Sequence, residues 1–234
     1  KNTKAIFHNH FCGYVGDIDA INKIGIDNGI PVVDDCIEAF GSEYKGNKLG
    51  NVDTDVSLFS FQTVRLPNTI DGGAIVFKNK ELFEKAKLIR DYGIDRSLFR
   101  TSNGEINSEC DIKLPGYGGL MSELNSFIGI KQMEGIENLL SKQKSNARIW
   151  DDKFLNNPTI VSLEKREGAV PNYWVYGTLC KNKLETIKEF KEKGFYATGV
   201  HINNNIYSVF NNNNSLKGVN EFMNHFVAIP SGWW

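Results

Sequence analysis

The feature that most constrains the fold is a regular alternation of short apolar runs with amphipathic helical segments in the first half of the chain. The segment 17–28 carries isoleucines three residues apart, which places them on one helical face, between Asp17 as an N-cap and Gly29 as a C-cap. The segment 78–90 repeats this helical pattern. Apolar runs of strand length lie at residues 4–8, 31–34, 57–61 and 74–77. This order predicts an α/β fold, in which helices flank a mostly parallel sheet.

The second half of the chain has a different organisation. Residues 96–119 are rich in turn-forming residues and are predicted to form a long excursion, and a long helix is predicted from 121 to 155. We therefore predict a large α/β domain over residues 1–151 and a small α+β domain over residues 152–234. The strands of the small domain are expected at 159–163, 173–179 and 195–200, and its helix at 184–192.

Charge and composition exclude several classes of protein. The 27 Lys and Arg residues and 28 Asp and Glu residues nearly cancel, which argues against a dedicated nucleic-acid-binding protein. No apolar run approaches the roughly 20 residues that span a bilayer, and the first ten residues lack the apolar core of a signal peptide. The four cysteines are far apart, and the histidines have no metal-ligand spacing. We expect a cytoplasmic protein with free thiols, without a metal, a membrane segment or a nucleic-acid partner.

Three groups of polar residues follow predicted strands, where α/β proteins collect their ligand chemistry. They are Asp34 with Asp35, Ser60, and the turn at Asp71–Gly73. A buried carboxylate at such an edge needs a positive or hydrogen-bonding partner, and a protonated pyridine nitrogen would serve. Two alternatives stay open, because the aspartates could instead cap a following helix and the glycines could form a simple hairpin turn.

Four segments in this order resemble one known family. PVVDDCIEAFGSEYKG at 31–46 is followed by FSF at 59–61, DGGAIVF at 71–77 and GYGGLMSELNSFIGIKQM at 116–133. The set is similar to the DegT/StrS family of sugar aminotransferases, which depend on pyridoxal 5′-phosphate (PLP). The resemblance implies the fold type I of PLP-dependent transferases. It also implies a nucleotide-linked keto-sugar substrate in deoxyamino-sugar biosynthesis, L-glutamate as amino donor, PLP or pyridoxamine 5′-phosphate (PMP) as cofactor, and a homodimer.

The resemblance also implies roles for individual residues. Asp35 would pair with the pyridinium nitrogen of the cofactor, and Ser60 would contact its phosphate. Glu38 stands where the family usually has a glutamine that hydrogen-bonds the ring hydroxyl. Tyr117 and His201 would contact the substrate.

The largest departure from the family pattern is Arg65. It occupies the position of the lysine that forms the imine with PLP, and no lysine lies between Ser60 and Phe77. Arginine stays protonated in proteins, so it neither forms that imine nor acts as a general base. Gly118 and Leu120 also replace the expected asparagine and arginine of the partner-facing loop.

These departures leave two hypotheses of function. The first is a PLP- or PMP-dependent aminotransferase-like protein with altered chemistry. The second is a non-catalytic homologue that binds a phosphate or nucleotide-sugar, or that partners an active subunit. A third reading, an unrelated α/β protein with chance motif similarity, predicts no affinity for PLP or PMP. The resemblance further implies a region before residue 4 and a final helix after residue 234, so we expect a fragment.

Overall fold

A computed structural model of the chain describes residues 2–211 and 214–233. These residues form two compact units, each built from several stretches of the chain. The first unit comprises Lys1–His8, Ile18–Ile37 and Gly50–Glu134, and the second comprises Asn9–Asp17, Glu38–Leu49 and Gly135–Trp234. The domain boundary predicted at residue 151 stays a prediction.

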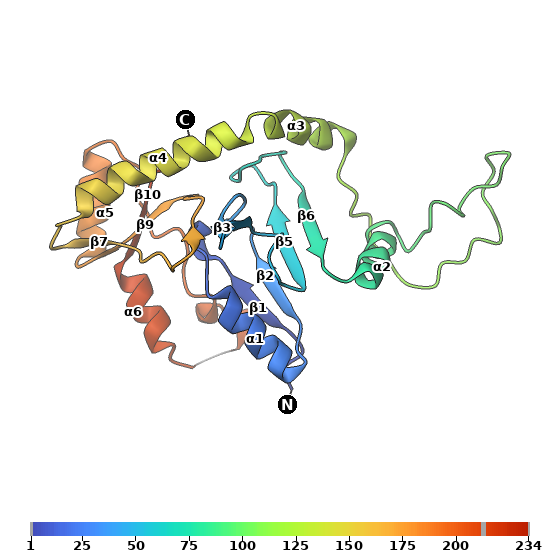
Figure 1. The fold of residues 1–234 in the computed structure, drawn as a ribbon, viewed down its shortest axis with the longest axis horizontal. Helices are drawn as coiled ribbons and strands as arrows, with labels where there is room; N and C mark the ends of the chain where they lie inside the picture. Colours follow the sequence, from blue (N-terminus) through green and yellow to red (C-terminus); the bar gives the residue numbers. More distant parts are fainter. Residues whose placement is uncertain (1, 212–213, 234) are drawn as a thin grey trace. The chain divides into compact units, whose positions relative to one another are not determined.

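The first unit contains a four-stranded sheet in the order β1-β2-β5-β6 (Figure 1). Its strands are β1 (Ile6–Asn9), β2 (Val32–Asp35), β5 (Val56–Ser60) and β6 (Gly73–Phe77). β2 and β5 run parallel, with Asp35 opposite Leu58, whereas β5 and β6 run antiparallel, with Ser60 opposite Gly73. All four strands appear within two residues of their predicted bounds. The predicted α/β class is confirmed, with a mixed sheet that keeps a parallel pair.

Two helices of this unit pack on strands of the sheet, α1 (Ile18–Asn28) on β2 and α2 (Lys80–Arg90) on β6. α1 ends where predicted, because Gly29 adopts a φ of 63° that terminates the helix. The side chain of Asn79 caps α2 by accepting a hydrogen bond from the Leu82 amide at 2.9 Å. Both helices therefore follow from local sequence signals.

The excursion between α2 and α3 is confirmed as a long segment without helices, extending away from the sheet in Figure 1. Arg96 anchors its start, donating from Nε and Nη2 to both carboxylate oxygens of Asp91 at 2.6 and 2.5 Å. The hydrogen bonds from Arg96 hold the pKa of Asp91 below its usual value. Apolar side chains along this segment are exposed, among them Leu98, Ile106 and Ile112.

The single helix predicted over residues 121–155 is wrong. The structure has two helices, α3 (Glu123–Met133) and α4 (Ile136–Phe154), interrupted by a turn at Glu134–Gly135. Glycine has a low helix propensity, which makes the chain easy to interrupt at residue 135. The start was predicted correctly, since Ser122 caps α3 by accepting a hydrogen bond from the Asn125 amide at 3.1 Å.

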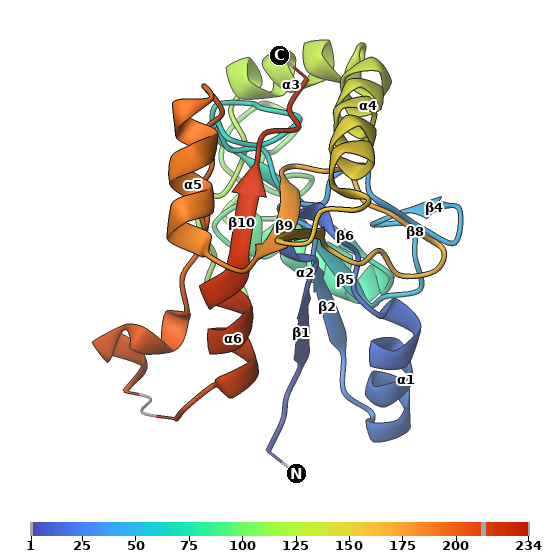
Figure 2. The same ribbon diagram turned by 90° about the vertical axis from the view of Figure 1, so that its left-hand side faces the viewer.

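The second unit contains two small antiparallel sheets, β10-β9-β7 and β4-β3-β8. Their strands are β3 (Glu43–Tyr44), β4 (Asn47–Lys48), β7 (Ile160–Ser162), β8 (Ala169–Val170), β9 (Tyr176–Cys180) and β10 (Phe226–Ile229). Helix α5 (Lys183–Glu192) packs on β9 and β10, as Figure 2 shows, and α6 (Lys217–His225) contacts β9. Short 3-10 turns lie at Phe11–Gly13, Asn204–Ile206 and Ser208–Phe210.

The strand predicted at 195–200 is wrong. Only Thr198 pairs there, in an isolated bridge with Ala228. The strand that pairs with β9 is instead β10, a fully buried strand that the sequence did not predict. A buried strand is apolar on both faces and therefore lacks the alternation that marks an exposed strand. Of the helices that the structure describes, none is long and apolar enough to cross a membrane.

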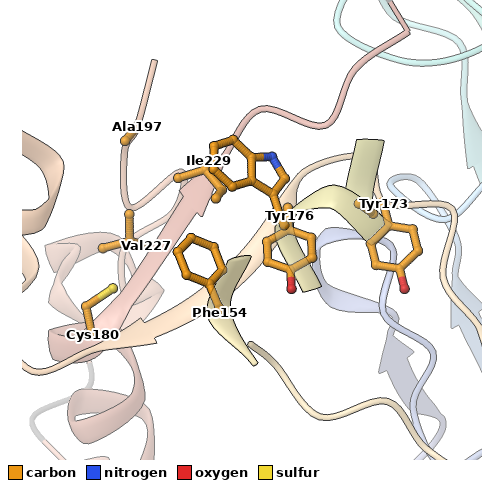
Figure 3. Close-up of a cluster of buried hydrophobic side chains, with 9 residues drawn as sticks. Phe154, Tyr173, Tyr176, Cys180, Ala197, Val227 and Ile229 are labelled. Carbon is orange, nitrogen blue, oxygen red and sulfur yellow. The ribbon is translucent and has the colours of Figure 1, made fainter. Parts of the chain in front are cut away.

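The core of the second unit is an aromatic cluster around α4, β9 and β10, drawn in Figure 3. Phe154 stacks on Trp150 with ring centroids 5.6 Å apart and an interplanar angle of 5°, and it also contacts Tyr176 and Phe190. Aromatic side chains bury large apolar areas, so they dominate the stability of such a core.

Replacing Phe154 by alanine is expected to lower the free energy of unfolding by about 3–5 kcal/mol, because the substitution leaves a cavity among these rings. Urea denaturation followed by circular dichroism measures this loss. The matched control is Leu155→Ala, because Leu155 is 78% exposed and its loss is expected to change stability by less than about 0.5 kcal/mol. Equal losses in the two variants would contradict the packing described here.

Candidate functional site

The carboxyl end of β2 carries two adjacent aspartates with different surroundings. Asp34 is fully buried, and its two carboxylate oxygens contact His8 Nδ1 at 3.0 Å and accept a hydrogen bond from Thr54 Oγ1 at 2.7 Å. Asp35 is 8% exposed, and its Oδ1 accepts a hydrogen bond from the backbone amide of Ile37 at 3.2 Å. Asp34 is therefore held by the body of the sheet, while Asp35 is the carboxylate at its edge.

The alternative that these aspartates cap a helix is wrong, because residues 36–42 form turns instead of a helix. Cys36 follows directly and is also buried. Burial, together with the charges of Asp34 and Asp35, raises the pKa of the Cys36 thiol. A thiol that stays protonated is a poor nucleophile, so Cys36 is not expected to react at this edge.

Ser60 lies at the same edge of the sheet, because β5 is the parallel neighbour of β2 and Ser60 is its last residue. Its hydroxyl oxygen accepts a hydrogen bond from the backbone amide of Gln62 at 3.3 Å, and the residue is half-buried. Across the antiparallel pair, a Cβ on Gly73 would lie 2.6 Å from the Phe59 carbonyl oxygen, so only glycine fits there. The structure thus places Asp35 and Ser60 at the same edge of the sheet, on adjacent parallel strands, as the sequence predicts.

The loop from residue 61 to residue 72 connects these antiparallel strands and carries Arg65. The alternative that the glycines belong to a hairpin is correct in one respect, because β5 and β6 are antiparallel neighbours. The connection between them is, however, much longer than a tight turn. Arg65 donates its amide to the Gln62 carbonyl at 2.8 Å. Asn68 exchanges two hydrogen bonds with the side chain of Gln132 on α3, at 2.7 and 2.6 Å. The backbone around residue 65 is therefore held by α3 as well as by its own turns.

The second unit holds Glu38 and His201, for which the family resemblance implies contacts with cofactor and substrate. Glu38 is 5% exposed, and its carboxylate accepts the Cys12 amide at 2.8 Å and contacts His201 Nε2 at 2.9 Å. Phe11 and Trp174 contact the His201 ring, with centroids 5.5 and 6.3 Å away. The structure therefore brings together two residues that lie 163 positions apart in the chain.

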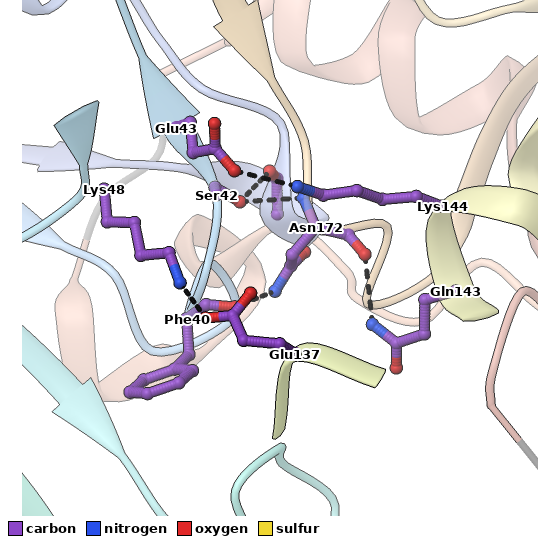
Figure 4. A network of polar contacts seen from close by, with 9 residues as sticks. Phe40, Ser42, Glu43, Lys48, Glu137, Gln143, Lys144 and Asn172 are labelled. Carbon is purple, nitrogen blue, oxygen red and sulfur yellow. Dashed lines mark hydrogen bonds and ion pairs between the residues drawn. The ribbon is translucent and has the colours of Figure 1, made fainter. Parts of the chain in front are cut away.

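The backbone that follows Glu38 is held by a polar network that the sequence analysis missed (Figure 4). Asn172 donates its side-chain amide to the carbonyl oxygens of Glu38 and Phe40 at 2.9 and 3.0 Å. The Ser42 hydroxyl accepts a hydrogen bond from the backbone amide of Asn172 at 2.9 Å and donates one to the Gly13 carbonyl. The available signal was weak: Asn172 is a polar residue directly before the aromatic segment YWVY at 173–176.

Tyr117 lies at the end of the excursion in the first unit, and its side chain is 75% exposed. Its backbone is anchored, because its amide donates to the Ile89 carbonyl at 2.7 Å and its carbonyl accepts the Tyr92 amide at 3.2 Å. Its role in binding substrate stays a prediction.

The chemistry of Asp35 and Ser60 at the sheet edge, and of Arg65 in the loop that follows β5, fits a phosphorylated pyridine held without a covalent bond. Asp35 supplies a carboxylate, Ser60 a hydroxyl and Arg65 a permanent cation. A guanidinium pairs well with phosphate, but it offers no free amine for an imine. The donor set therefore fits PLP or PMP as a bound ligand, and it does not fit covalent attachment of PLP at residue 65.

Comparisons with known proteins agree with the fold and with the sequence resemblance. A transaminase for UDP-4-amino-4,6-dideoxy-N-acetyl-beta-L-altrosamine from Campylobacter jejuni (strain 81-176) is 35% identical over 192 residues, which are 82% of this chain and 49% of the relative. The sugar aminotransferase CalS13 from Micromonospora echinospora superimposes with a TM-score of 0.90 at 25% identity, over 99% of this chain and 63% of that structure. AtS13 from Actinomadura melliaura superimposes with a TM-score of 0.91 at 28% identity, over 99% of this chain and 62% of that structure.

The chain spans about half the length of the curated relatives that it matches. The model of the DegT/DnrJ/EryC1/StrS aminotransferase family matches residues 1–232. The expected fold type I of PLP-dependent transferases is confirmed by the similar solved structures. The chain belongs to the DegT/DnrJ/EryC1/StrS aminotransferase family.

Proposed function

We propose that this chain is part of an aminotransferase-like protein that binds PMP or PLP non-covalently and acts on a nucleotide-linked keto-sugar. The observation that carries the proposal is the placement of Asp35 and Ser60 at the carboxyl ends of two adjacent parallel strands. When bound, the cofactor supplies an electron sink for amino-group transfer. Family membership and the similarity to sugar transaminases support the class of substrate.

Asp35, Ser60 and Arg65 each have a separate task in this proposal. Asp35 holds a proton on the pyridine nitrogen, which keeps the ring electron-poor. Ser60 donates its hydroxyl to the cofactor phosphate, and Arg65 contributes a positive charge there. Residues 1–151 form the cofactor-binding domain and residues 152–234 the small domain. We further propose L-glutamate as amino donor, a homodimer and a cytoplasmic location, in keeping with the family.

The second candidate function is a non-catalytic homologue, and Arg65 is the observation that favours it. A guanidinium in the lysine position can hold a phosphate or a sugar carboxylate, but it cannot take part in an imine. Such a protein would bind the nucleotide-sugar or partner an active subunit without turning substrate over.

A single-turnover experiment on the full protein separates these two functions. The protein is saturated with PMP and mixed with a UDP-linked 4-keto-6-deoxy sugar, and the sugar is analysed by mass spectrometry. We expect replacement of the carbonyl oxygen by an amino group, with release of an equal amount of PLP. Binding of both ligands without this conversion would select the non-catalytic homologue. Failure to bind PMP, PLP or the sugar would contradict both functions.

A further inference from the structure

The second unit brings a cysteine, a glutamate and a histidine close together. Cys12 Sγ, a carboxylate oxygen of Glu38 and a ring nitrogen of His201 all lie within 4.8 Å of one another. We propose that these three residues form a binding site for Zn²⁺. The proposal concerns the second unit alone and goes beyond the proposed function, because it needs neither cofactor nor sugar. Spacing along the chain does not indicate this site, since Glu38 lies 26 positions from Cys12 and 163 from His201.

The distances among the three ligand atoms suit a tetrahedral zinc ion. Zinc bonds to nitrogen, oxygen and sulfur are about 2.0–2.3 Å long, which places tetrahedral ligands roughly 3.3–3.6 Å apart. No separation in this cluster exceeds 4.8 Å, and Glu38 Oε1 lies 2.9 Å from His201 Nε2. Side-chain movements of about 1 Å therefore suffice to close the three ligands around an ion. The ion would replace the hydrogen bond between Glu38 and His201.

The Glu38 carboxylate can bind an ion and keep its other contact, because the two contacts use different oxygens. Oε2 accepts a hydrogen bond from the backbone amide of Cys12 at 2.8 Å, whereas Oε1 contacts His201. Oε1 is therefore the zinc ligand of the proposed site, and Oε2 stays on the amide. Such a hydrogen bond behind the ligand atom orients the ligand and strengthens metal binding.

Burial and charge also favour a divalent cation. Cys12 is fully buried and the Glu38 side chain is 4% exposed, whereas the His201 side chain is 41% exposed. Zn²⁺ cancels the two negative charges of a thiolate and a carboxylate, so the loaded site carries no net charge in its buried surroundings. The exposed imidazole gives the ion a path from solvent. Three protein ligands leave the fourth tetrahedral position to water.

The segments that carry Cys12 and Glu38 are fixed to each other by hydrogen bonds behind the site. The Ser42 hydroxyl donates to the carbonyl of Gly13, directly after Cys12, at 2.9 Å. Asn172 donates its side-chain amide to the Glu38 carbonyl at 2.9 Å and its backbone amide to the Ser42 hydroxyl (Figure 4). These bonds hold two of the three ligands before any ion arrives, which lowers the cost of ordering them on binding.

The third ligand is held by aromatic neighbours. Phe11 meets the His201 ring edge-on, with centroids 5.5 Å apart, and Trp174 stacks on it at 6.3 Å. The backbone amide of Trp174 donates to the side-chain oxygen of Asn172 at 2.9 Å. Asn172 therefore supports both the Glu38 backbone and the residue that stacks on His201, so one network positions all three ligands.

The mixed set of donor atoms selects zinc among the common divalent ions. Thiolate and imidazole are ligands that suit Zn²⁺, whereas Mg²⁺ and Ca²⁺ prefer oxygen ligands alone. The competing interpretation is a Glu38–His201 hydrogen bond that only stabilises the fold. That interpretation predicts no specific zinc binding, so a titration distinguishes the two.

The first experiment measures zinc binding to the full protein by isothermal titration calorimetry, after treatment with a chelator and in the absence of PMP. We expect a single Zn²⁺ ion per chain. Cys12→Ser, Glu38→Gln and His201→Gln should each weaken binding by about 100-fold or more, because loss of a partner behind a ligand already costs about 10–100-fold. Circular dichroism checks that each variant is folded. The matched controls are Cys180→Ser and His225→Gln, which remove the same groups elsewhere in the second unit and should bind zinc normally.

The second experiment uses Co²⁺ in place of zinc, because tetrahedral cobalt absorbs visible light and a bound thiolate adds a charge-transfer band in the near ultraviolet. Both signals are expected in the unmodified protein and in Cys180→Ser. The charge-transfer band should disappear in Cys12→Ser. This spectrum tests the site even where a variant fails to fold, since a missing charge-transfer band in the unmodified protein would by itself overturn the proposal.

Two further results would also overturn the zinc site. One is a lack of zinc binding by the unmodified protein, and the other is undiminished binding by folded Cys12→Ser or His201→Gln. Because both experiments omit the cofactor and the sugar, neither result bears on the proposed function.

Discussion

Replacing Asp35 by alanine is expected to weaken PMP binding by about 100-fold or more. The carboxylate is 8% exposed at the end of β2, and the proposed partner is the protonated ring nitrogen of the cofactor. Removing one member of a buried charge pair costs about 3–5 kcal/mol, and each 1.4 kcal/mol corresponds to about tenfold in affinity. Isothermal titration calorimetry with PMP measures the change directly.

Two further variants make this result specific. Asp35→Asn keeps the size of the side chain and loses its charge, so its affinity for PMP should fall between those of the unmodified protein and Asp35→Ala. Asp27→Asn removes an exposed aspartate of α1 that pairs with Lys23, and it should bind PMP normally. If Asp35→Ala, folded by circular dichroism, bound PMP as tightly as Asp27→Asn, the role given to Asp35 would be wrong.

The second large effect is expected from Arg65→Lys, which should form an imine with PLP where the unmodified protein forms none at this position. The substitution replaces a permanently protonated guanidinium by an amine, the group that PLP condenses with. The backbone at residue 65 lies in a loop that α3 holds through Gln132, so the new amine starts from a defined position. The expected readouts are a yellow absorption band and, after borohydride reduction, a PLP adduct on residue 65 by peptide mass spectrometry.

A matched control is needed because PLP also reacts with lysines on protein surfaces. Arg148→Lys introduces the same side chain at an exposed position of α4, and it should add no band at equal PLP concentration. A trapped adduct in the unmodified protein would show that another lysine serves the cofactor. If Arg65→Lys stayed colourless, the assignment of Arg65 to the lysine position would be wrong.

Much of the candidate site was predictable because its residues sit in local motifs. Asp35 and Ser60 follow apolar strands, and parallel neighbours bring their carboxyl ends to one edge. The different surroundings of Asp34 and Asp35 were not predictable, since they depend on His8 and Thr54, which contact Asp34 from other segments of the chain. The pairing of Glu38 with His201 was equally hidden, because no local pattern relates residues so far apart.

The same division holds for the fold. The sequence by itself determined the helices α1, α2 and α5 and the strands of the first sheet, because periodicity, N-caps and terminating glycines act over a few residues. Only the tertiary structure decided that β6 runs antiparallel to β5 and that β10, not residues 195–200, forms the strand beside β9. Strand partners are chosen by burial and backbone hydrogen bonds between distant segments, and these interactions exist only once the chain has folded.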